Sequence, residues 1–598
     1  MKGHLSSIRE ALDAGLNTEA LDLARQAASG SPDAEIRYLG ALACARLGAL
    51  DDAERWLAPV DRESLGDSAL AVEVWSLAGR IAKERYAAAA RAGASVAAQD
   101  LARSAIDCYR QAFAVGGSAY PAVNAATLAT LSGDAPLARR LARAALSAPG
   151  AGGDHWHHAS AGEALLLLDD IDAARAHYAE AHRLAGSRFG DIAAMRRQLL
   201  LIGSDAARDL LAVVPAPQVI AFSGHMIDHP ARAAPRFPAA LEPKVAAALH
   251  EELARLGPSI GYAQAACGAD ILFLESMQDA AMQTHVVLPF AKTDFISQSV
   301  GFAGYAWVAR FERALERATR VLIATAEAFL GDEVLFEHAA NLVQGMAFLH
   351  ARELSTQPLM LTVLEAGSPA LVGGTASSAR IWTRRGGRTE NIDLAALRGV
   401  ASACRQDGQD RAAATSAGAA AARRSLKSLL FADISGFSRM PEQQTPHFVG
   451  LFLETCARIL DTLEHRAVDA NTRGDALFLV FEQPSHAADC AVRLQQAMRL
   501  IDYTAFGLAR DTGVRVGLHT GPVYRVFDPV MAKATFYGTH VNLAARLEPV
   551  VHTGHVFVTE AFAASLVAED EGRFRCHYIG AMPLAKGFGA SRLFRLDC

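Results

Sequence analysis

The stretch SLKSLLFADISGFSRM, residues 425–440, decides the fold of the C-terminal third of the chain. Its apolar run over 426–431 predicts a buried β-strand, and this strand ends on Asp433. A second stretch, NTRGDALFLVF at 471–481, places Asp475 where one predicted strand turns into the next. Two carboxylates at strand ends can hold two hard divalent cations through oxygen ligands. A lone aspartate at such a place is usually a turn or capping residue, but the pair indicates a metal site.

A turn made of Ser435, Gly436 and Phe437 follows the first strand. Its backbone N–H groups can cradle phosphate groups beside a helix N-terminus. Further on, the helical segment THVNLAARL places Asn542 and Arg546 four residues apart, which puts both side chains on one helix face. An asparagine there can hold a ribose, and an arginine can meet charge that develops on a phosphate.

A glycine-bounded loop, LAKGFG at 584–589, carries Lys586 before the last predicted strand. A lysine there can act as a point charge on a polyphosphate. Any one of these features would be weak evidence for a functional site, because a basic residue usually belongs to a solvated face. Their order and spacing together indicate a nucleotide-processing site.

These motifs resemble those of class III adenylate and guanylate cyclases. FADISGF is similar to the family's F-x-D-I-x-G-F, TRGDALF to its second metal motif, VRVGLHTG to R-I-G-I-H-x-G, YGTHVNLAARLE to W-G-x-x-V-N-x-A-A-R-L, and LAKGFG to its Lys-Gly loop. The resemblance spans residues 425–598 and implies a ferredoxin-like βαββαβ core with extra strands. It also implies that the ribose 3′-oxygen of a nucleoside triphosphate attacks the α-phosphorus in line, which releases pyrophosphate and leaves a 3′,5′-cyclic nucleotide for intracellular signalling.

The resemblance further implies two Mg²⁺ or Mn²⁺ ions per active site. Carried over by motif, the implied residues are Asp433, Asp475 and the Ile434 carbonyl for the metals, Asn542 and Arg546 for the transition state, and Lys586 for phosphate. In the family the site lies between two such domains, one of which supplies the aspartates and the other the remaining groups. Because this chain has one copy, a two-fold homodimer with two equivalent sites is expected.

The base-reading positions match neither family pattern. Adenylate cyclases typically have Lys and Asp there and guanylate cyclases Glu and Cys, whereas this chain has Asn471 and Thr535. ATP and GTP are the expected substrates, but this neutral pair can also read a pyrimidine, so a CTP or UTP cyclase stays open. Another alternative is a nucleotide-binding regulatory or adaptor protein without turnover, although such a protein would be free to lose a catalytic residue and none is lost.

Residues 1–205 show helix after helix, in which apolar stretches at helical spacing alternate with Gly/Asp turns. The pattern resembles tetratricopeptide repeats, and residues 64–107 fit the period poorly, which suggests an insertion. Stacked helix pairs form a solenoid with a concave face. We expect that face to bind a protein partner; a packing scaffold is the other interpretation.

Residues 216–370 alternate short apolar strands with helices, which predicts a parallel sheet covered on both faces. The pattern S-G-H…C-G-A-D…L-P-F resembles the SLOG superfamily of Rossmann-like domains and implies a nucleotide-like ligand near Gly224 and Gly268. The alternative is that these glycines only allow tight turns. A catalytic role for this domain would need Asp270 or Glu275 as its acid or nucleophile.

An Ala/Gly/Ser/Thr-rich segment, 371–424, predicts a linker, the second part of which is either a helical lever or a passive tether. The fold class is therefore multidomain: an α solenoid, an α/β Rossmann-like domain and an α+β ferredoxin-like domain.

Composition excludes several classes of protein. Of 598 residues, 51% are hydrophobic and 20% are charged, a composition that is typical of a globular protein and not of a disordered one. The net charge of −6 provides no positive electrostatic field that would attract nucleic acid. No apolar run is long enough to cross a bilayer, and the N-terminus lacks the apolar core of a signal peptide. The eight cysteines are scattered without a CxxC pair, which is typical of reduced thiols in a cytoplasmic protein.

Overall fold

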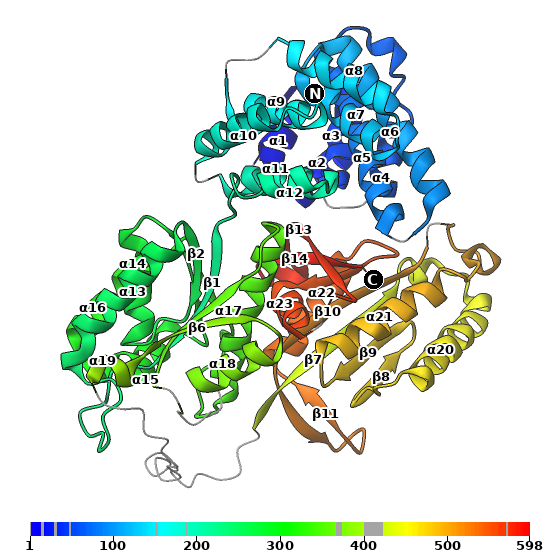
Figure 1. Ribbon diagram of the computed structural model, residues 1–598. Coiled ribbons are helices and arrows are strands. Elements are labelled where there is room, and N and C mark those ends of the chain that lie inside the picture. Colours follow the sequence, from blue (N-terminus) through cyan, green and yellow to red (C-terminus); the bar gives the residue numbers. More distant parts are fainter. Residues whose placement is uncertain are drawn as a thin grey trace. The chain divides into compact units, whose positions relative to one another are not determined.

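The chain forms two compact units in a computed structural model (Figure 1). One unit is residues 1–216 with the short segments 353–355 and 579–581, and the other unit is the remainder. The structure describes residues 2–13, 17–28, 33–46, 50–91, 93–149, 153–186, 188–365, 367, 374–399, 423–510, 512–569 and 572–597.

The first unit is helical. Its elements are α1 (Lys2–Asp13), α2 (Asn17–Ala27), α3 (Ala34–Arg46), α4 (Leu50–Leu57), η1 (Glu63–Leu65), α5 (Ala69–Arg91), α6 (Ser95–Gly116), α7 (Ala119–Leu131), α8 (Ala135–Ser147), α9 (His155–Leu167), α10 (Ile171–Ala185), α11 (Phe189–Ile202) and α12 (Asp205–Leu210). Consecutive helices pack in pairs, and the Asp134 and Asp170 side chains cap α8 and α10 at the predicted turns. Fully buried alanines where helices meet allow the close packing, and the predicted repeats are confirmed.

The poor fit of residues 64–107 to the repeat period falls on two long helices. This region contains α5, which is 23 residues long, and the first part of α6, which is 22 residues long, and the two helices pack against each other. The other described helices of this unit have 15 residues or fewer. The misfit therefore coincides with an elongated helix pair, and an insertion relative to the repeat stays a prediction.

The second unit begins with a parallel sheet of six strands in the order β4-β3-β2-β1-β5-β6. The elements are β1 (Gln218–Gly224), η2 (Ala239–Leu241), α13 (Glu242–Leu256), β2 (Ser259–Ala263), α14 (Ala269–Asp279), β3 (Gln283–Leu288), α15 (Lys292–Ser299), η3 (Gly301–Ala303), α16 (Tyr305–Glu316), β4 (Arg320–Ile323), α17 (Val334–Glu353), β5 (Leu359–Leu364), α18 (Thr375–Arg384), β6 (Arg388–Asp393) and α19 (Leu394–Arg398). Right-handed crossovers put α13, α14 and α16 on one face and α17 and α18 on the other (Figure 1).

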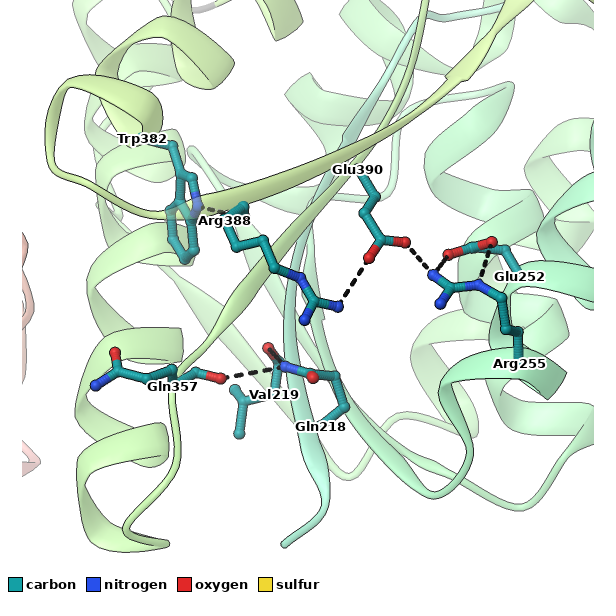
Figure 2. Close-up of polar contacts among 8 residues, drawn as sticks. All are labelled: Gln218, Val219, Glu252, Arg255, Gln357, Trp382, Arg388 and Glu390. Carbon is teal, nitrogen blue, oxygen red and sulfur yellow. Dashed lines mark hydrogen bonds and ion pairs between the residues drawn. The ribbon is translucent and has the colours of Figure 1, made fainter.

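The predicted linker over 371–424 is wrong in its first part, because α18, β6 and α19 belong to the middle domain. Figure 2 shows how β6 is held: the Trp382 indole donates to the Arg388 carbonyl at 2.9 Å, and Arg255 joins Glu252 to Glu390. Trp382 is fully buried. Residues 400–422, including most of the segment expected as a lever or tether, lie outside the described residues.

The C-terminal part of the second unit is an α+β fold. Its elements are β7 (Arg424–Ile434), η4 (Phe437–Arg439), η5 (Glu442–Gln444), α20 (Thr445–Thr462), β8 (Asp469–Arg473), β9 (Ala476–Phe481), α21 (Pro484–Met498), η6 (Tyr503–Phe506), β10 (Val514–Asp528), β11 (Lys533–Tyr537), α22 (Thr539–Leu547), η7 (Glu548–Val550), β12 (Val556–Thr559), α23 (Glu560–Glu569), β13 (Arg575–Pro583), η8 (Ala585–Gly587) and β14 (Ala590–Asp597). The sheet order is β13-β14-β12-β10-β7-β9-β8, and β11 pairs with β10. The run from β7 to β10 is βαββαβ with the order β10-β7-β9-β8, so the predicted ferredoxin-like core is confirmed.

Helix α22 covers one face of this core. Its residues Val541 and Ala544 pack into an apolar cluster with Leu429, Val523 and Phe536 of the sheet. Alternate residues of β7 point to the same face, so Leu429 lies on the face that also carries Asp433 at the end of the strand. Among the described residues, no helix is long and apolar enough to cross a membrane.

Candidate active site

Strand register brings the two predicted metal-binding aspartates together. Strands β7 and β9 are antiparallel with Ala432 opposite Leu477, so Asp433 lies beside the β8–β9 turn that carries Asp475. The two carboxyl groups are within hydrogen-bonding range of each other. Burial, followed by the hydrogen bond and charge of Asp433, raises the pKa of Asp475 to about 7.

Two charged residues that the sequence reasoning did not single out complete this cluster. The Arg515 guanidinium lies 2.8 Å from Asp433 Oδ2 and 2.8 Å from a carboxylate oxygen of Glu548. Burial, opposed by Arg515, raises the pKa of Glu548 to about 7. Both residues stand inside the motifs VRVGLHTG and AARLEP, but only the fold places them beside Asp433.

The donor set fits hard divalent cations. Asp433 and Asp475 present carboxylate oxygens, which are the ligands that Mg²⁺ and Mn²⁺ prefer. Two carboxylates in such close contact repel each other when both are ionised, and a cation between them removes that repulsion. Ile434 lies between them at the buried end of β7, and its N–H donates to Asp475.

The turn after β7 is less open than predicted. The Ser435 N–H donates to the Gly513 carbonyl at 3.0 Å, and the Ser435 hydroxyl accepts from the Gly513 N–H. The Ser435 amide is therefore used inside the protein, so any phosphate contact falls to Gly436 and Phe437. Gly436 has a φ of 78°, a left-handed conformation that favours glycine.

Helix α22 carries Asn542 and Arg546 one turn apart, with Asn542 exposed. The 3₁₀ turn η8, which contains Lys586, contacts α22. Lys586 is exposed and has a φ of 60°. A strained, outward-pointing lysine in a glycine-rich loop is consistent with the predicted phosphate contact but also with a surface turn.

The predicted base-reading residues lie near each other, but Thr535 is buried. Its hydroxyl donates to the Asp469 carboxylate, which also pairs with the Lys533 ammonium at 2.9 Å. The Asn471 amide lies 3.9 Å from the sulfur of Met531 in the β10–β11 hairpin. A Lys/Asp pair is present here, but with the two residue types exchanged relative to the family pattern: Asp469 lies two residues before Asn471, and Lys533 lies two residues before Thr535.

The described residues show two separate groups. The aspartates form one group with Arg515 and Glu548, and α22 with the Lys586 loop forms another. Among the residues that the structure describes, no hydrogen bond or ion pair joins Asn542 or Arg546 to Asp433 or Asp475.

The predicted ligand turn of the middle domain is filled by the protein itself. A Cβ on Gly268, whose φ is 115°, would lie 2.5 Å from the Ile227 nitrogen, so glycine is required for packing. The buried Asp270 carboxylate accepts from the N–H groups of Gly224 and Ala266. The interpretation as tight turns is thus supported by direct contacts, while a ligand here stays a prediction.

Asp270 and Glu275, the residues that a catalytic role of the middle domain would need, are both held in structural contacts. Asp270 is 7% exposed and hydrogen-bonded to the backbone, and burial raises its pKa to about 7. Glu275 accepts from Arg310 at 2.9 and 2.5 Å. Both carboxylates therefore have structural partners.

Comparison with known proteins agrees with this architecture. Residues 421–596 match the model of the adenylate and guanylate cyclase catalytic domain, and residues 17–129 match the model described as Tetratricopeptide Repeats-Sensor. The similarity to individual curated proteins covers a quarter of this chain or less.

A Rhizobium meliloti (strain 1021) protein named as an adenylate cyclase is 29% identical over 142 residues, which is 23% of this chain and 23% of that protein. The Myxococcus xanthus serine/threonine-protein kinase pkn2 is 30% identical over 152 residues, 25% of this chain and 18% of the kinase. The chain thus spans less than a quarter of the length of these relatives. A solved guanylate cyclase domain from Catenaria anguillulae in complex with GTP is 19% identical, with 29% of this chain and 96% of that domain covered and a TM-score of 0.25.

Proposed function

We propose that this chain converts a nucleoside triphosphate to a 3′,5′-cyclic nucleotide and pyrophosphate, because residues 421–596 match the model of the adenylate and guanylate cyclase catalytic domain. The observation that carries the proposal is the β7–β9 register, which brings Asp433 and Asp475 into contact on the same sheet that supports α22. The retention of the complete set Asp433, Asp475, Asn542 and Arg546 favours turnover, because a protein that only bound nucleotide would be free to lose one of them.

In this reaction the ribose 3′-oxygen forms a bond to the α-phosphorus, the bond to the β-phosphate oxygen breaks, and pyrophosphate leaves with the electron pair. The proton of the 3′-hydroxyl is lost to solvent or to a substrate phosphate oxygen. Arg546 would stabilise charge on the α-phosphoryl group, Asn542 would orient the ribose, and Lys586 would bind the triphosphate. Little covalent chemistry is required of the protein beyond positioning.

Two Mg²⁺ or Mn²⁺ ions would be held by Asp433, Asp475 and the Ile434 carbonyl, and when bound they would supply charge stabilisation for the 3′-oxygen and the triphosphate. The Arg515 guanidinium balances the carboxylates and keeps Glu548 in place.

The separation of the two residue groups supports a site shared between two copies of the domain. Within the described residues, Asn542 and Arg546 make no hydrogen bond or ion pair with Asp433 or Asp475. A two-fold homodimer would place α22 of one copy against the aspartates of the other and would form two equivalent sites.

ATP and GTP are the proposed substrates, and CTP or UTP is the alternative. Asn471 would contact the base, while Thr535 would act through Asp469, because its hydroxyl is buried and already donates to that carboxylate. The Lys533 side chain is one-third exposed, so its ammonium group is better placed than the buried Thr535 hydroxyl to contact the base.

The test is mass-spectrometric detection of cyclic nucleotides. The full-length chain is incubated with ATP, GTP, CTP and UTP, each with Mn²⁺ and with Mg²⁺, next to an Asp475→Ala variant. We expect one dominant cyclic product from the natural chain and none from the variant. Product from neither protein would favour the nucleotide-binding adaptor, and equal product from both would refute the two-aspartate site.

A further inference from the structure

Helix α22, which carries the proposed transition-state residues, has no side-chain cap of its own. It begins after Gly538, which offers no oxygen to the free N–H groups of the first turn. The Thr539 N–H instead donates to Oε1 of Glu327 at 3.2 Å. Glu327 belongs to the middle domain, in the loop between β4 and α17. A carboxylate from another domain therefore caps this helix and places negative charge at its positive end.

The same carboxylate is held by a buried arginine at the start of the cyclase sheet. Arg424, the first residue of β7, has a side chain that is 1% exposed. Its guanidinium lies 2.6 Å from Glu327 Oε2 and 2.6 Å from Asp332 Oδ2, and it donates to the Ala328 carbonyl at 2.9 Å. Removing one member would leave an uncompensated buried charge. The Glu327 carboxylate and the Arg424 guanidinium are therefore held in fixed positions relative to each other.

The loop that supplies Glu327 is anchored in the core of its own domain. The Phe329 N–H donates to Asp294, and the Phe329 ring stacks on Phe290 at 4.8 Å between centroids. The Glu327 N–H donates to the buried Thr325 hydroxyl. The cap is thus presented by a rigid part of the parallel-sheet domain and not by a free surface loop.

Further contacts hold the same two parts of the second unit together. Arg320 of β4 makes a two-pronged pair with Glu560 of α23, at 2.6 and 2.5 Å. Gly345 of α17 approaches α23 so closely that a Cβ there would lie 2.1 Å from the Ala564 carbonyl oxygen. The buried contact of Glu327 is therefore one part of a continuous interface.

We propose that Glu327 is a positioning residue for cyclisation: by capping α22 it sets the position of Asn542 and Arg546, so the middle domain controls turnover through the β4–α17 loop. This inference rests on the proposed function. Thr539, Asn542 and Arg546 follow one another at intervals of three and four residues and lie on one side of α22. A shift of the helix N-terminus, which Glu327 holds, therefore moves all three residues together. The loop follows the carboxyl end of β4, which is the edge where parallel-sheet domains bind ligands. Ligand binding at this edge would shift the loop and, through Glu327, would move α22.

The test compares Glu327→Ala and Glu327→Gln with Glu333→Ala, an exposed carboxylate of the same loop, in the full-length chain. We expect Glu327→Ala to lower kcat by about tenfold or more while KM for the metal–triphosphate changes by less than about twofold, because the aspartate site is untouched. Glu327→Gln keeps an acceptor for the Thr539 N–H and should fall between the natural chain and the alanine variant. Glu333→Ala should match the natural chain.

Hydrogen–deuterium exchange separates positioning from general damage. Peptides covering 539–547 should exchange faster in Glu327→Ala, while peptides covering 427–432 should keep the natural rate. Faster exchange in both would mean that the variant only loosens the fold, which overturns the proposal, as would a kcat equal to that of Glu333→Ala. If the natural chain makes no cyclic nucleotide, the proposed function fails, and the exchange at 539–547 alone then decides whether Glu327 positions the helix.

Discussion

Burial of His338 makes the second unit sensitive to acid. This histidine lies on α17, is 1% exposed, and neither ring nitrogen has a hydrogen-bond partner among the described residues. Burial, with a smaller contribution from His540, lowers the pKa of His338 to about 3. The folded chain therefore keeps the ring neutral at pH 5, whereas the unfolded chain binds a proton below about pH 6.5.

The sign and size of the effect follow from proton linkage. Between pH 6.5 and about 3 the unfolded state binds more protons, so the free energy of unfolding falls as the pH falls. At pH 5, 1.5 pH units below the unfolded pKa, one such histidine costs about 2 kcal/mol relative to pH 8. His338→Phe fills a similar volume without a titrating group and should lose about 2 kcal/mol less than the natural chain over this range.

Urea unfolding at pH 8 and pH 5, followed by pulsed hydrogen exchange of an α17 peptide, measures this difference within the domain concerned. The control is His250→Phe, which changes an exposed histidine of α13 and should keep the natural pH dependence. The neighbouring buried histidines are present in both chains, so the difference measures the contribution of His338 together with its coupling to them. A gap between the natural chain and His338→Phe that is the same at both pH values would refute the argument.

Three further outcomes are expected. A 1:1 mixture of Asp433→Ala and Arg546→Ala, each inactive alone, should regain about a quarter of the natural turnover, because half of the random dimers keep one complete site; no recovery, once mixed dimers are seen by native mass spectrometry, would argue against the shared site. Gly345→Leu should destabilise the second unit by about 1–3 kcal/mol, since its side chain would overlap the Ala564 carbonyl, and an unchanged urea midpoint would contradict the close approach. Burial raises the pKa of Asp270 to about 7, so the natural chain should lose up to about 4 kcal/mol as the pH rises from 4 past 7, and Asp270→Asn should flatten that slope; an unaltered pH profile of unfolding would show that the carboxyl group is not buried.

Local sequence determined much of the cyclase domain. The apolar run before Asp433 and the turn at Asp475 are recognisable without a structure, because strand periodicity and turn residues are local signals. The helix face shared by Asn542 and Arg546 follows from spacing alone. The helical repeats were also predictable, since their Gly/Asp turns and small residues recur.

Two strands of the middle domain have weak local signals. β2 is a five-residue strand that contains Gly261, and β6 reads RTENID, which has almost no apolar character. β6 forms at the edge of the sheet because β5 offers it a ladder and Trp382 buries its indole against it. The formation of β6 depends on partners that are distant in the chain, so its polar sequence does not predict a strand.

What only the tertiary structure decided is which distant charges meet. Arg515 and Glu548 reach Asp433, Lys533 reaches Asp469, and Glu327 reaches the start of α22, across separations of up to 212 residues. A charged residue looks the same in sequence whether it faces water or a buried partner, because its partner is chosen by strand register and domain packing. The sequence by itself therefore determined the chemistry that the cyclase motifs supply, whereas the tertiary structure determined how the middle domain holds the helix that carries part of that chemistry.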